Sequence, residues 1–384
     1  MPWNQSVPMT ERMKFIVAHQ SGAWSMTELC ARFGVSRRVG YKWLHRFEAE
    51  GIDGLKDRSR APHRSPQRMD PVIERLLLET RQRHPHWGPR KIIPWLLRRH
   101  PDLVGRLPAP STVGDLLRRQ GLVRPRKRRR VAEHRPAGAL HTTAPNEVWS
   151  ADFKGEFLLR NGRYCYPFTL ADAHSRYLLS CTACRATELK GARAALIRAF
   201  RTYGLPGAIR TDNGTPFVGH GYTGLSTLSV WWTKLGIEHQ RIEKRRPDQN
   251  GRHERMHRTL KAEATRPPER EPRAQQRRFD AFRAEFNQER PHEALAYETP
   301  ADVYHRSRRP YPERLPSPHY EGHWEKRKVD NGGAFKFRTR RIFVAQPLRR
   351  EWLGLEEVKD GLWSVYFHQL LIGRLDENTG ILSV

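Results

Sequence analysis

The sequence predicts a multidomain α/β protein: two helical blocks, then a mixed α/β core, then a small all-β domain that we expect to be a barrel. Three observations support this fold class. Apolar residues recur at helical spacing in the first third of the chain, strand and helix patterns alternate after it, and strand signals separated by glycine turns fill the end. A chain of 384 residues is also too long for one compact core.

Charge is the strongest compositional feature. The chain has 70 Lys and Arg against 41 Asp and Glu, a net charge of +29. Such an excess indicates a polyanionic partner, because each phosphate neutralised by Lys or Arg releases a condensed counterion. A high-GC genome, in which Arg replaces Lys, is the alternative explanation. It accounts for the many arginines but not for the shortage of acids. Few cysteines and no apolar leader or membrane-length apolar run predict a reducing compartment and no membrane association.

Residues 1–60 are expected to form a helix-turn-helix domain. Ser25 and Glu28 have the spacing of a helix capping box, and Gly34 allows a tight turn before Ser36 caps the next helix. That second helix would lie in the DNA major groove with a basic face. Its candidate DNA-binding residues are Arg37, Arg38, Lys42 and Arg46. A plain helical hairpin that binds nothing is the alternative.

Residues 67–123 are expected to form a second helix-turn-helix domain. Three helical segments are predicted there, with Ser111 capping the third and Gly121 ending it. A basic linker, residues 124–145, follows. Its candidate DNA-binding residues are Arg124, Arg126, Lys127, Arg128, Arg129 and Arg130, and a solvated linker without DNA is the alternative reading of this charge run.

Residues 146–305 are expected to form the mixed α/β core with a trailing helix, and residues 316–384 the β-barrel. The core begins with the patterns of three strands. A helix, a strand, a helix, a strand and a final helix follow, and this order predicts a mixed sheet covered by helices. Trp231 and Trp232 are expected in its interior. In the last domain, Trp363 and Tyr366 suit either a core or a DNA-stacking role.

Three acids occupy positions that suit metal chemistry. Asp152 lies in the first core strand, Asp212 where the fourth strand ends, and Glu254 on the helix after the fifth strand. Adjacent strands bring the first two together, and a helix across the strand ends brings the third. Grouped carboxylates repel each other unless a cation is present, and Mg²⁺ and Mn²⁺ prefer oxygen ligands. Two such ions about 4 Å apart support an in-line displacement at phosphorus.

The motifs around these acids resemble those of a known family. The segments WSADF, RTDNGTPF and QNGRHERMHRTLK are similar to the three catalytic motifs of integrase-like DDE transposases of bacterial insertion sequences. The resemblance implies an RNase H-like core of the retroviral-integrase type. It also implies that Asp152, Asp212 and Glu254 are the catalytic residues and metal ligands. Arg258 and Lys261 share a helical face with Glu254 and would contact the same DNA end.

From this resemblance we expect a transposase that binds terminal inverted repeats and performs metal-dependent DNA cleavage and strand transfer. Its cofactor would be Mg²⁺, with Mn²⁺ able to substitute and two ions per active site. Its partners would be double-stranded DNA, both the repeats and the target, and a second copy of itself in a dimer or tetramer on DNA. We expect it in the bacterial cytoplasm, associated with the nucleoid.

Several alternatives stay open. The second and third acids are farther apart than in retroviral integrases, which makes Asp248 a rival to Glu254. Each acid also has an ordinary structural role available: a strand-edge acid, a turn cap, or an ion-pair partner of Arg258. No zinc module is expected, because the Cys181–Cys184 pair falls in a core strand without histidines at ligand spacing. A non-joining nuclease and a DNA-binding regulator with an inactive core are the rival functions.

Overall fold

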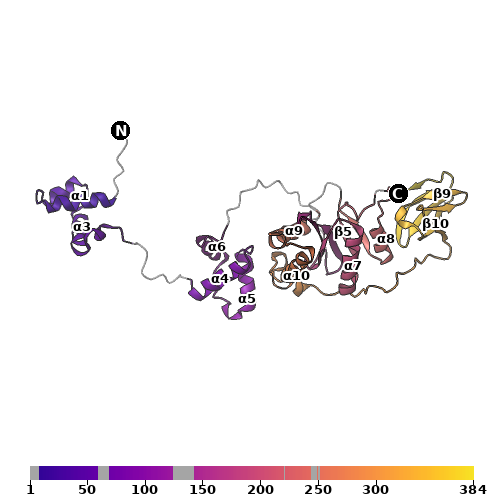
Figure 1. Ribbon diagram of the computed structural model, residues 1–384, viewed down its shortest axis with the longest axis horizontal. Coiled ribbons are helices and arrows are strands. Elements are labelled where there is room, and N and C mark those ends of the chain that lie inside the picture. The colour runs from indigo at the N-terminus through magenta and orange to yellow at the C-terminus, as the bar shows by residue number, and fades with distance from the viewer. Residues whose placement is uncertain (1–7, 59–68, 124–141, 220, 244–248, 250) are drawn as a thin grey trace, which may run out of the picture. The chain divides into compact units, whose positions relative to one another are not determined.

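The computed structural model describes residues 8–58, 69–123, 142–219, 221–243, 249 and 251–384 (Figure 1). The chain divides into two compact units, Met1–Met69 and Asp70–Val384. Each unit is described separately below. In the described ranges, no helix has both the length and the apolar character needed to cross a bilayer.

The first unit contains three helices and a short 3₁₀ turn: α1 (Pro8–Gln20), α2 (Met26–Arg32), α3 (Arg37–Glu50) and η1 (Gly51–Leu55). The predicted capping box is confirmed, since Ser25 accepts from the Glu28 N–H and Glu28 accepts from the Ser25 N–H. Ser36 caps α3 as predicted. Gly40 allows the close crossing of α2 and α3, because a Cβ there would lie 2.7 Å from the Cys30 sulfur.

The second helical block opens the second unit with α4 (Pro71–Arg83), α5 (Pro89–Arg99), η2 (Pro101–Leu103) and α6 (Pro110–Arg119). The prediction that Ser111 caps α6 is wrong. Ala109 occupies the cap position and Pro110 the first helical position, so Ser111 lies inside the first turn. Proline suits that first position because it has no N–H to satisfy. Gly121 follows the end of α6 with φ of 68°, in agreement with its predicted role.

The core is built on one mixed sheet. Its strands are β1 (Val148–Phe153), β2 (Phe157–Leu158), β3 (Tyr164–Asp172), β4 (Leu178–Cys184), β5 (Ala208–Thr211) and β6 (Glu238–Arg241). β3 pairs antiparallel with both β1 and β4, whereas β5 lies parallel between β1 and β6. β1 is therefore central, with an antiparallel half of the sheet on one side and a parallel half on the other.

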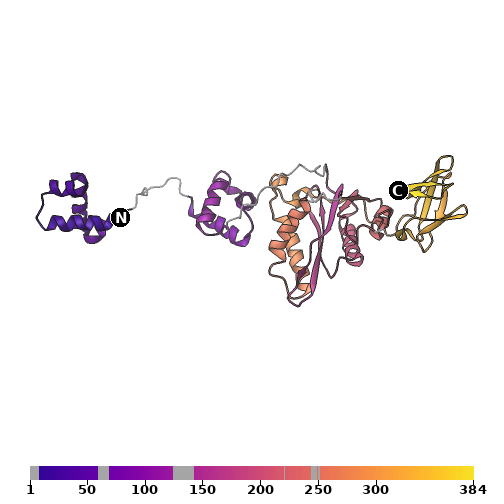
Figure 2. The ribbon, with the colours of Figure 1, turned by 90° about the horizontal axis from the view of Figure 1, so that it is seen from above.

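Helices cover both faces of this sheet (Figure 2). On one face, α7 (Leu189–Tyr203) and α8 (Thr227–Lys234) bury a cluster that includes Trp149, Phe200 and Trp232. On the other face, α9 (Gly251–Ala264) and α10 (Pro272–Gln288) bury a second cluster around Leu260 and Phe279. The core ends with η4 (Glu293–Leu295) and α11 (Pro300–Val303). The alternation of strands and helices predicted from the sequence is confirmed.

Side chains of α10 occupy the outer edge of β4. The Asn287 amide accepts from the Leu178 N–H at 2.8 Å and donates to the Leu178 carbonyl at 3.0 Å. Gln276 makes the same kind of double contact, accepting from the Ala183 N–H and donating to the Cys181 carbonyl. An open strand edge is a template for pairing with another chain. These two amides therefore satisfy backbone groups that would otherwise be available to such a strand.

The C-terminal region contains β7 (Glu325–Lys328), β8 (Ala334–Phe337), β9 (Arg340–Phe343), η5 (Gln346–Leu348), β10 (Trp352–Lys359), β11 (Leu362–Phe367), β12 (Leu370–Asp376) and β13 (Leu382–Ser383). The expected closed barrel is not found among the described residues. β7 and β10–β13 form a five-stranded sheet, and β8–β9 form a separate hairpin. Phe335, Phe337 and Ile342 of the hairpin share one apolar cluster with the sheet. The hairpin therefore joins the sheet by side-chain packing.

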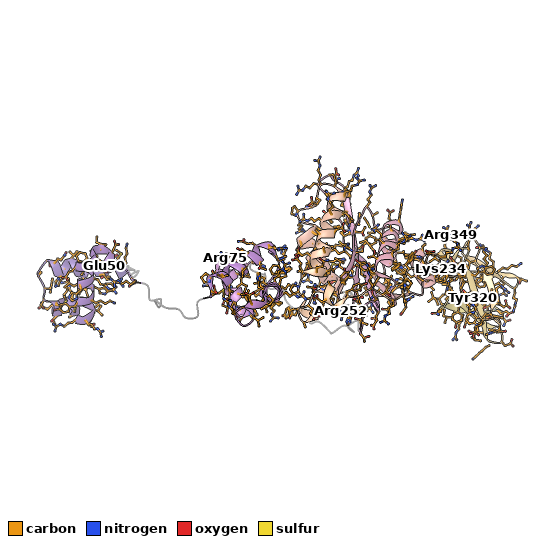
Figure 3. The ribbon with its side chains drawn as sticks, turned by 90° about the horizontal axis from the view of Figure 1, so that it is seen from below. Glu50, Arg75, Lys234, Arg252, Tyr320 and Arg349 are labelled. Carbon is orange, nitrogen blue, oxygen red and sulfur yellow. The ribbon has the colours of Figure 1, made fainter. Side chains whose placement is uncertain are left out.

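Helix α8 belongs to two apolar clusters at once. Trp231 and Trp232 are buried in the core cluster, as predicted, whereas Val230 is buried in the cluster of the C-terminal region. Lys234, at the end of α8, is labelled in Figure 3. Its ammonium forms a 2.8 Å ion pair with Glu351. α8 thus connects the core to the C-terminal sheet through both apolar packing and charge.

The structure shows the environment of Trp363, for which the sequence left two roles open, and of the four cysteines. Trp363 is buried and donates to Glu377 at 2.8 Å, so it is a core residue. Trp352, which the sequence did not single out, is 47% exposed. All four cysteines are free and buried, including Cys181 and Cys184. Burial raises the pKa of Cys165 to about 12.

Candidate active site

Asp152 lies on β1, and Asp212 directly follows β5, the parallel neighbour of β1. The register of β1 and β5 aligns Val148 with Ala208 and Ser150 with Arg210. Each acid follows two residues after the last aligned pair. Side chains two residues apart point to the same face of a sheet, and neighbouring strands lie about 4.8 Å apart. The two half-buried acids therefore lie at the same end of two adjacent strands.

The residues after Asp212 form the turn that the sequence predicts. The Gly214 N–H donates to Asp212 Oδ1 at 3.2 Å, and the Asn213 amide donates to the Ile242 carbonyl at 2.7 Å. The turn-capping role considered for Asp212 is therefore present. It uses one carboxylate oxygen and only one N–H, so it is compatible with further interactions of the same carboxyl group.

A buried threonine hydroxyl holds the backbone of each acid. Thr169 on β3 donates to the Asp152 carbonyl at 3.1 Å, and Thr211 on β5 donates to the Asp212 carbonyl at 2.8 Å. Thr169 is 0% exposed and Thr211 is 1% exposed. A hydroxyl has a single hydrogen, so each threonine can only accept from any further partner. The two acids are thus fixed by matching contacts at their main chains.

Three histidine rings contact the hydroxyl groups of Thr169 and Thr211. Nε2 of His253 and Nε2 of His257, both on α9, lie 2.7 Å from the Thr169 hydroxyl oxygen. On the other side of the site, Nε2 of His239 lies 2.9 Å from the Thr211 hydroxyl oxygen. Because the threonine protons are used at the carbonyls, these rings donate their Nε2–H groups.

Burial keeps these imidazoles neutral. It lowers the pKa of His253 and of His239 to about 4, and the pKa of His257 to about 2. For His257 the neighbouring His253 acts in the same direction. A neutral ring carries one proton, so the Nδ1 atoms of these rings carry lone pairs.

His257 also faces the first acid. Its Nδ1 atom lies 3.8 Å from Asp152 Oδ2, and the two side chains are only 8% and 16% exposed. Asp152, His253 and His257 each offer a ligand atom, and the three atoms lie within 4.8 Å of one another. Sequence reasoning missed these histidines. The available signal was their placement at positions i and i+4 of one helix, on either side of Glu254.

Glu254 lies on the exposed side of α9. Arg258 and Lys261 are exposed as well, whereas His253 and His257 belong to the buried side of the same helix. The shared face predicted for the three exposed residues is consistent with this pattern. Among the described residues, Glu254 and Arg258 form no ion pair with each other. The helix reaches Asp152 through His257, one turn after Glu254, which puts Glu254 on the helix that borders the first acid.

The remaining predicted residues lie elsewhere or outside the described ranges. Arg37, Arg38 and Lys42 are exposed on α3, and Arg46 is half-buried. The ammonium of Lys42 and the guanidinium of Arg46 both lie over the Trp43 ring, at 4.8 and 5.1 Å from its centroid. Arg124, Arg126, Lys127, Arg128, Arg129, Arg130 and the rival ligand Asp248 fall outside the described residues.

Comparison with protein families matches the core to one domain class. Residues 142–247 and 235–300 match models described as integrase core domain. Residues 11–63 match a helix-turn-helix domain, and residues 39–117 match a homeodomain-like domain. The chain therefore has an integrase core preceded by helix-turn-helix domains, as the motifs had indicated.

Individual relatives come from mobile elements. The chain is 32% identical over 190 residues to an uncharacterized 31.7 kDa protein of insertion element IS407 from Burkholderia multivorans, covering 49% of this chain and 66% of the relative. It is 30% identical over 181 residues to an uncharacterized 39.2 kDa protein of IS476 from Xanthomonas euvesicatoria, covering 46% of this chain and 50% of that protein. The chain thus matches between half and two thirds of the length of these relatives.

A solved structure with partial similarity is the catalytic core domain of HTLV-2 integrase in complex with magnesium. It shares 17% sequence identity, covers 44% of this chain and 99% of its own, and has a TM-score of 0.34.

Proposed function

We propose that this protein is a transposase that binds the terminal inverted repeats of an insertion sequence and catalyses DNA strand cleavage and strand transfer. The observation that carries the proposal is the alignment of Ser150 with Arg210 on adjacent strands of an integrase core, because Asp152 and Asp212 each follow two residues later. The insertion-element relatives and the helix-turn-helix domains agree with it. The site of action would be the DNA of the bacterial nucleoid, in the cytoplasm.

The donor set suits a divalent cation. Asp152 and Asp212 are half-buried carboxylates on adjacent strands, where mutual repulsion favours a bound cation. We assign Asp152, Asp212 and Glu254 as the ligands of Mg²⁺, with Mn²⁺ able to substitute and two ions per site. Bound there, the ions would supply charge neutralisation and an activated oxygen nucleophile for displacement at phosphorus.

The protein's own side chains would hold the DNA. Arg258 and Lys261 project from the exposed face of α9 that also carries Glu254, so they suit the phosphates next to the reacting bond. Arg37, Arg38 and Lys42 on the second helix of the first domain suit the recognition of the repeat. The basic segment 124–130 would add phosphate contacts. Joining two ends requires two copies, so the acting form would be a dimer or tetramer on double-stranded DNA.

The test is a strand-transfer assay with the element's own ends, run in Mg²⁺ and in EDTA. The full chain is compared with Glu254→Gln, and Asp248→Asn is the matched control. Joined products that require Mg²⁺, disappear in Glu254→Gln and persist in Asp248→Asn would support the proposal. If joined products instead persist in Glu254→Gln and disappear in Asp248→Asn, the third metal ligand is Asp248. Cleavage without joining would indicate a nuclease, and binding without cleavage under every metal condition would indicate a regulator.

A further inference from the structure

We propose that His257 is an additional ligand of the cation at Asp152, and that this site therefore binds transition cations such as Mn²⁺ more tightly than Mg²⁺. The inference rests on the proposed function, because it extends the carboxylate site by one nitrogen ligand.

The separation of the two ligand atoms suits a shared cation. His257 Nδ1 and Asp152 Oδ2 lie 3.8 Å apart, which is too far for a hydrogen bond. Two atoms bound to one ion lie at most about 4.2 Å apart, since metal–nitrogen and metal–oxygen bonds are each about 2.1 Å. The observed separation falls within that limit. One cation can therefore contact both atoms with little movement of either side chain.

The hydrogen bonding of the ring leaves Nδ1 available. The Thr169 hydroxyl donates to the Asp152 carbonyl and contacts His257 Nε2 at 2.7 Å, so Nε2 carries the ring proton. The Nδ1 lone pair then faces the carboxylate. Metal-binding histidines are commonly oriented by such a hydrogen bond from the other ring nitrogen. The Thr169 hydroxyl therefore orients the imidazole of His257 and also holds the backbone of Asp152, so one side chain positions both proposed ligands.

His253 has a different role. Its Nε2 makes the same 2.7 Å contact with Thr169, but its ring is buried and its Nδ1 has no hydrogen-bond partner among the described residues. The ring of His253 packs edge-on against that of His257, with centroids 4.6 Å apart. We therefore assign His253 as a positioning residue that braces the ring of His257.

The mixed donor set determines the cation preference. Mg²⁺ takes oxygen ligands almost exclusively, whereas imidazole nitrogen binds first-row transition cations. A site with Asp152, Asp212 and Glu254 alone would bind Mg²⁺ and Mn²⁺ through oxygen. Adding His257 stabilises the Mn²⁺ form selectively.

The experiment measures Mn²⁺ bound to the full chain by electron paramagnetic resonance. Electron spin-echo modulation of the wild-type Mn²⁺ form should contain the ¹⁴N coupling of a directly bound imidazole. His257→Gln should abolish that coupling and weaken Mn²⁺ binding at least about tenfold, with a much smaller effect on Mg²⁺. The matched control is His239→Gln, which removes the buried ring at Thr211 and should keep the ¹⁴N coupling.

Absence of ¹⁴N coupling in the wild-type protein overturns the inference, and this result does not depend on the folding of any variant. Asp152→Asn and Asp212→Asn separate the two proposals. If these substitutions weaken Mn²⁺ binding while the wild-type spectrum lacks nitrogen coupling, only the role of His257 fails. If they leave Mn²⁺ binding unchanged, the carboxylates are not ligands and the proposed function fails as well.

Discussion

Ser150 and Arg210 face each other on the parallel strands β1 and β5, and an acid follows two residues after each of them. This register places two acids from distant parts of the chain at the same end of adjacent strands. A shift of one residue would turn one acid to the opposite face, because the side-chain period of a strand is two. Apolar residues next to the aligned pair support this register: Trp149, Ala151 and Ile209 all belong to the apolar cluster on the α7 side of the sheet.

Thr169 is expected to stabilise the site through its hydroxyl group. Thr169→Val keeps the shape but removes the donor to the Asp152 carbonyl and the acceptor for two buried imidazoles. Leaving such groups unsatisfied costs about 1–3 kcal/mol. We expect urea unfolding to show a loss of free energy of unfolding in this range, together with weaker strand transfer. Thr169→Ser should restore both, and equal stability of the valine variant would contradict the hydrogen-bond scheme.

Asn287 is expected to be essential to the edge of β4. Asn287→Leu removes both contacts to Leu178 and leaves a buried N–H and a buried carbonyl without partners. The expected loss is about 1–3 kcal/mol for each group. Gln288→Leu, at the exposed neighbouring position, should change stability by less than about 0.5 kcal/mol. Urea denaturation of the two variants measures the difference, and comparable losses would refute the assignment.

Acid should destabilise the fold through His292. Burial lowers the pKa of His292 from 6.5 in the unfolded chain to about 3 in the folded protein. Between these values the unfolded chain binds the extra proton, so the free energy of unfolding falls as the pH falls from 6.5 towards 3. Above pH 6.5 this contribution is fully present. Urea midpoints measured from pH 8 to pH 4 should decline less steeply in His292→Gln than in the wild type.

DNA binding should depend steeply on salt. Each phosphate contact contributes a slope of about −0.9 in log K against log salt concentration. Replacing Arg37, Arg38 or Lys42 with Ala should reduce the magnitude of the slope by about one if that residue contacts a phosphate. Lys14→Ala is the control, because Lys14 already pairs with Glu11 at 2.9 Å. Fluorescence anisotropy between 50 and 200 mM salt tests this, and an unchanged slope in all three variants would exclude α3 from the interface.

Local patterns in the sequence were enough to predict the order of the main strands and helices of the core. This was possible because apolar periodicity and turn residues are local signals. The capping box of Ser25 and Glu28 and the buried tryptophans of α8 were predictable for the same reason. The assignment of Ser111 failed because proline at the first helical position made a side-chain cap unnecessary.

The side chains that support the acids could not be predicted from local patterns, because they come from distant parts of the chain. Thr169 and His257 are separated by 88 positions in the chain, and their 2.7 Å contact depends on how α9 crosses the sheet. The C-terminal region differs from the expected barrel because β8 and β9 form a separate hairpin. This hairpin packs its apolar side chains against the five-stranded sheet of the same region. Packing of this kind joins distant segments through side-chain shape and paired polar groups, which local sequence patterns do not encode.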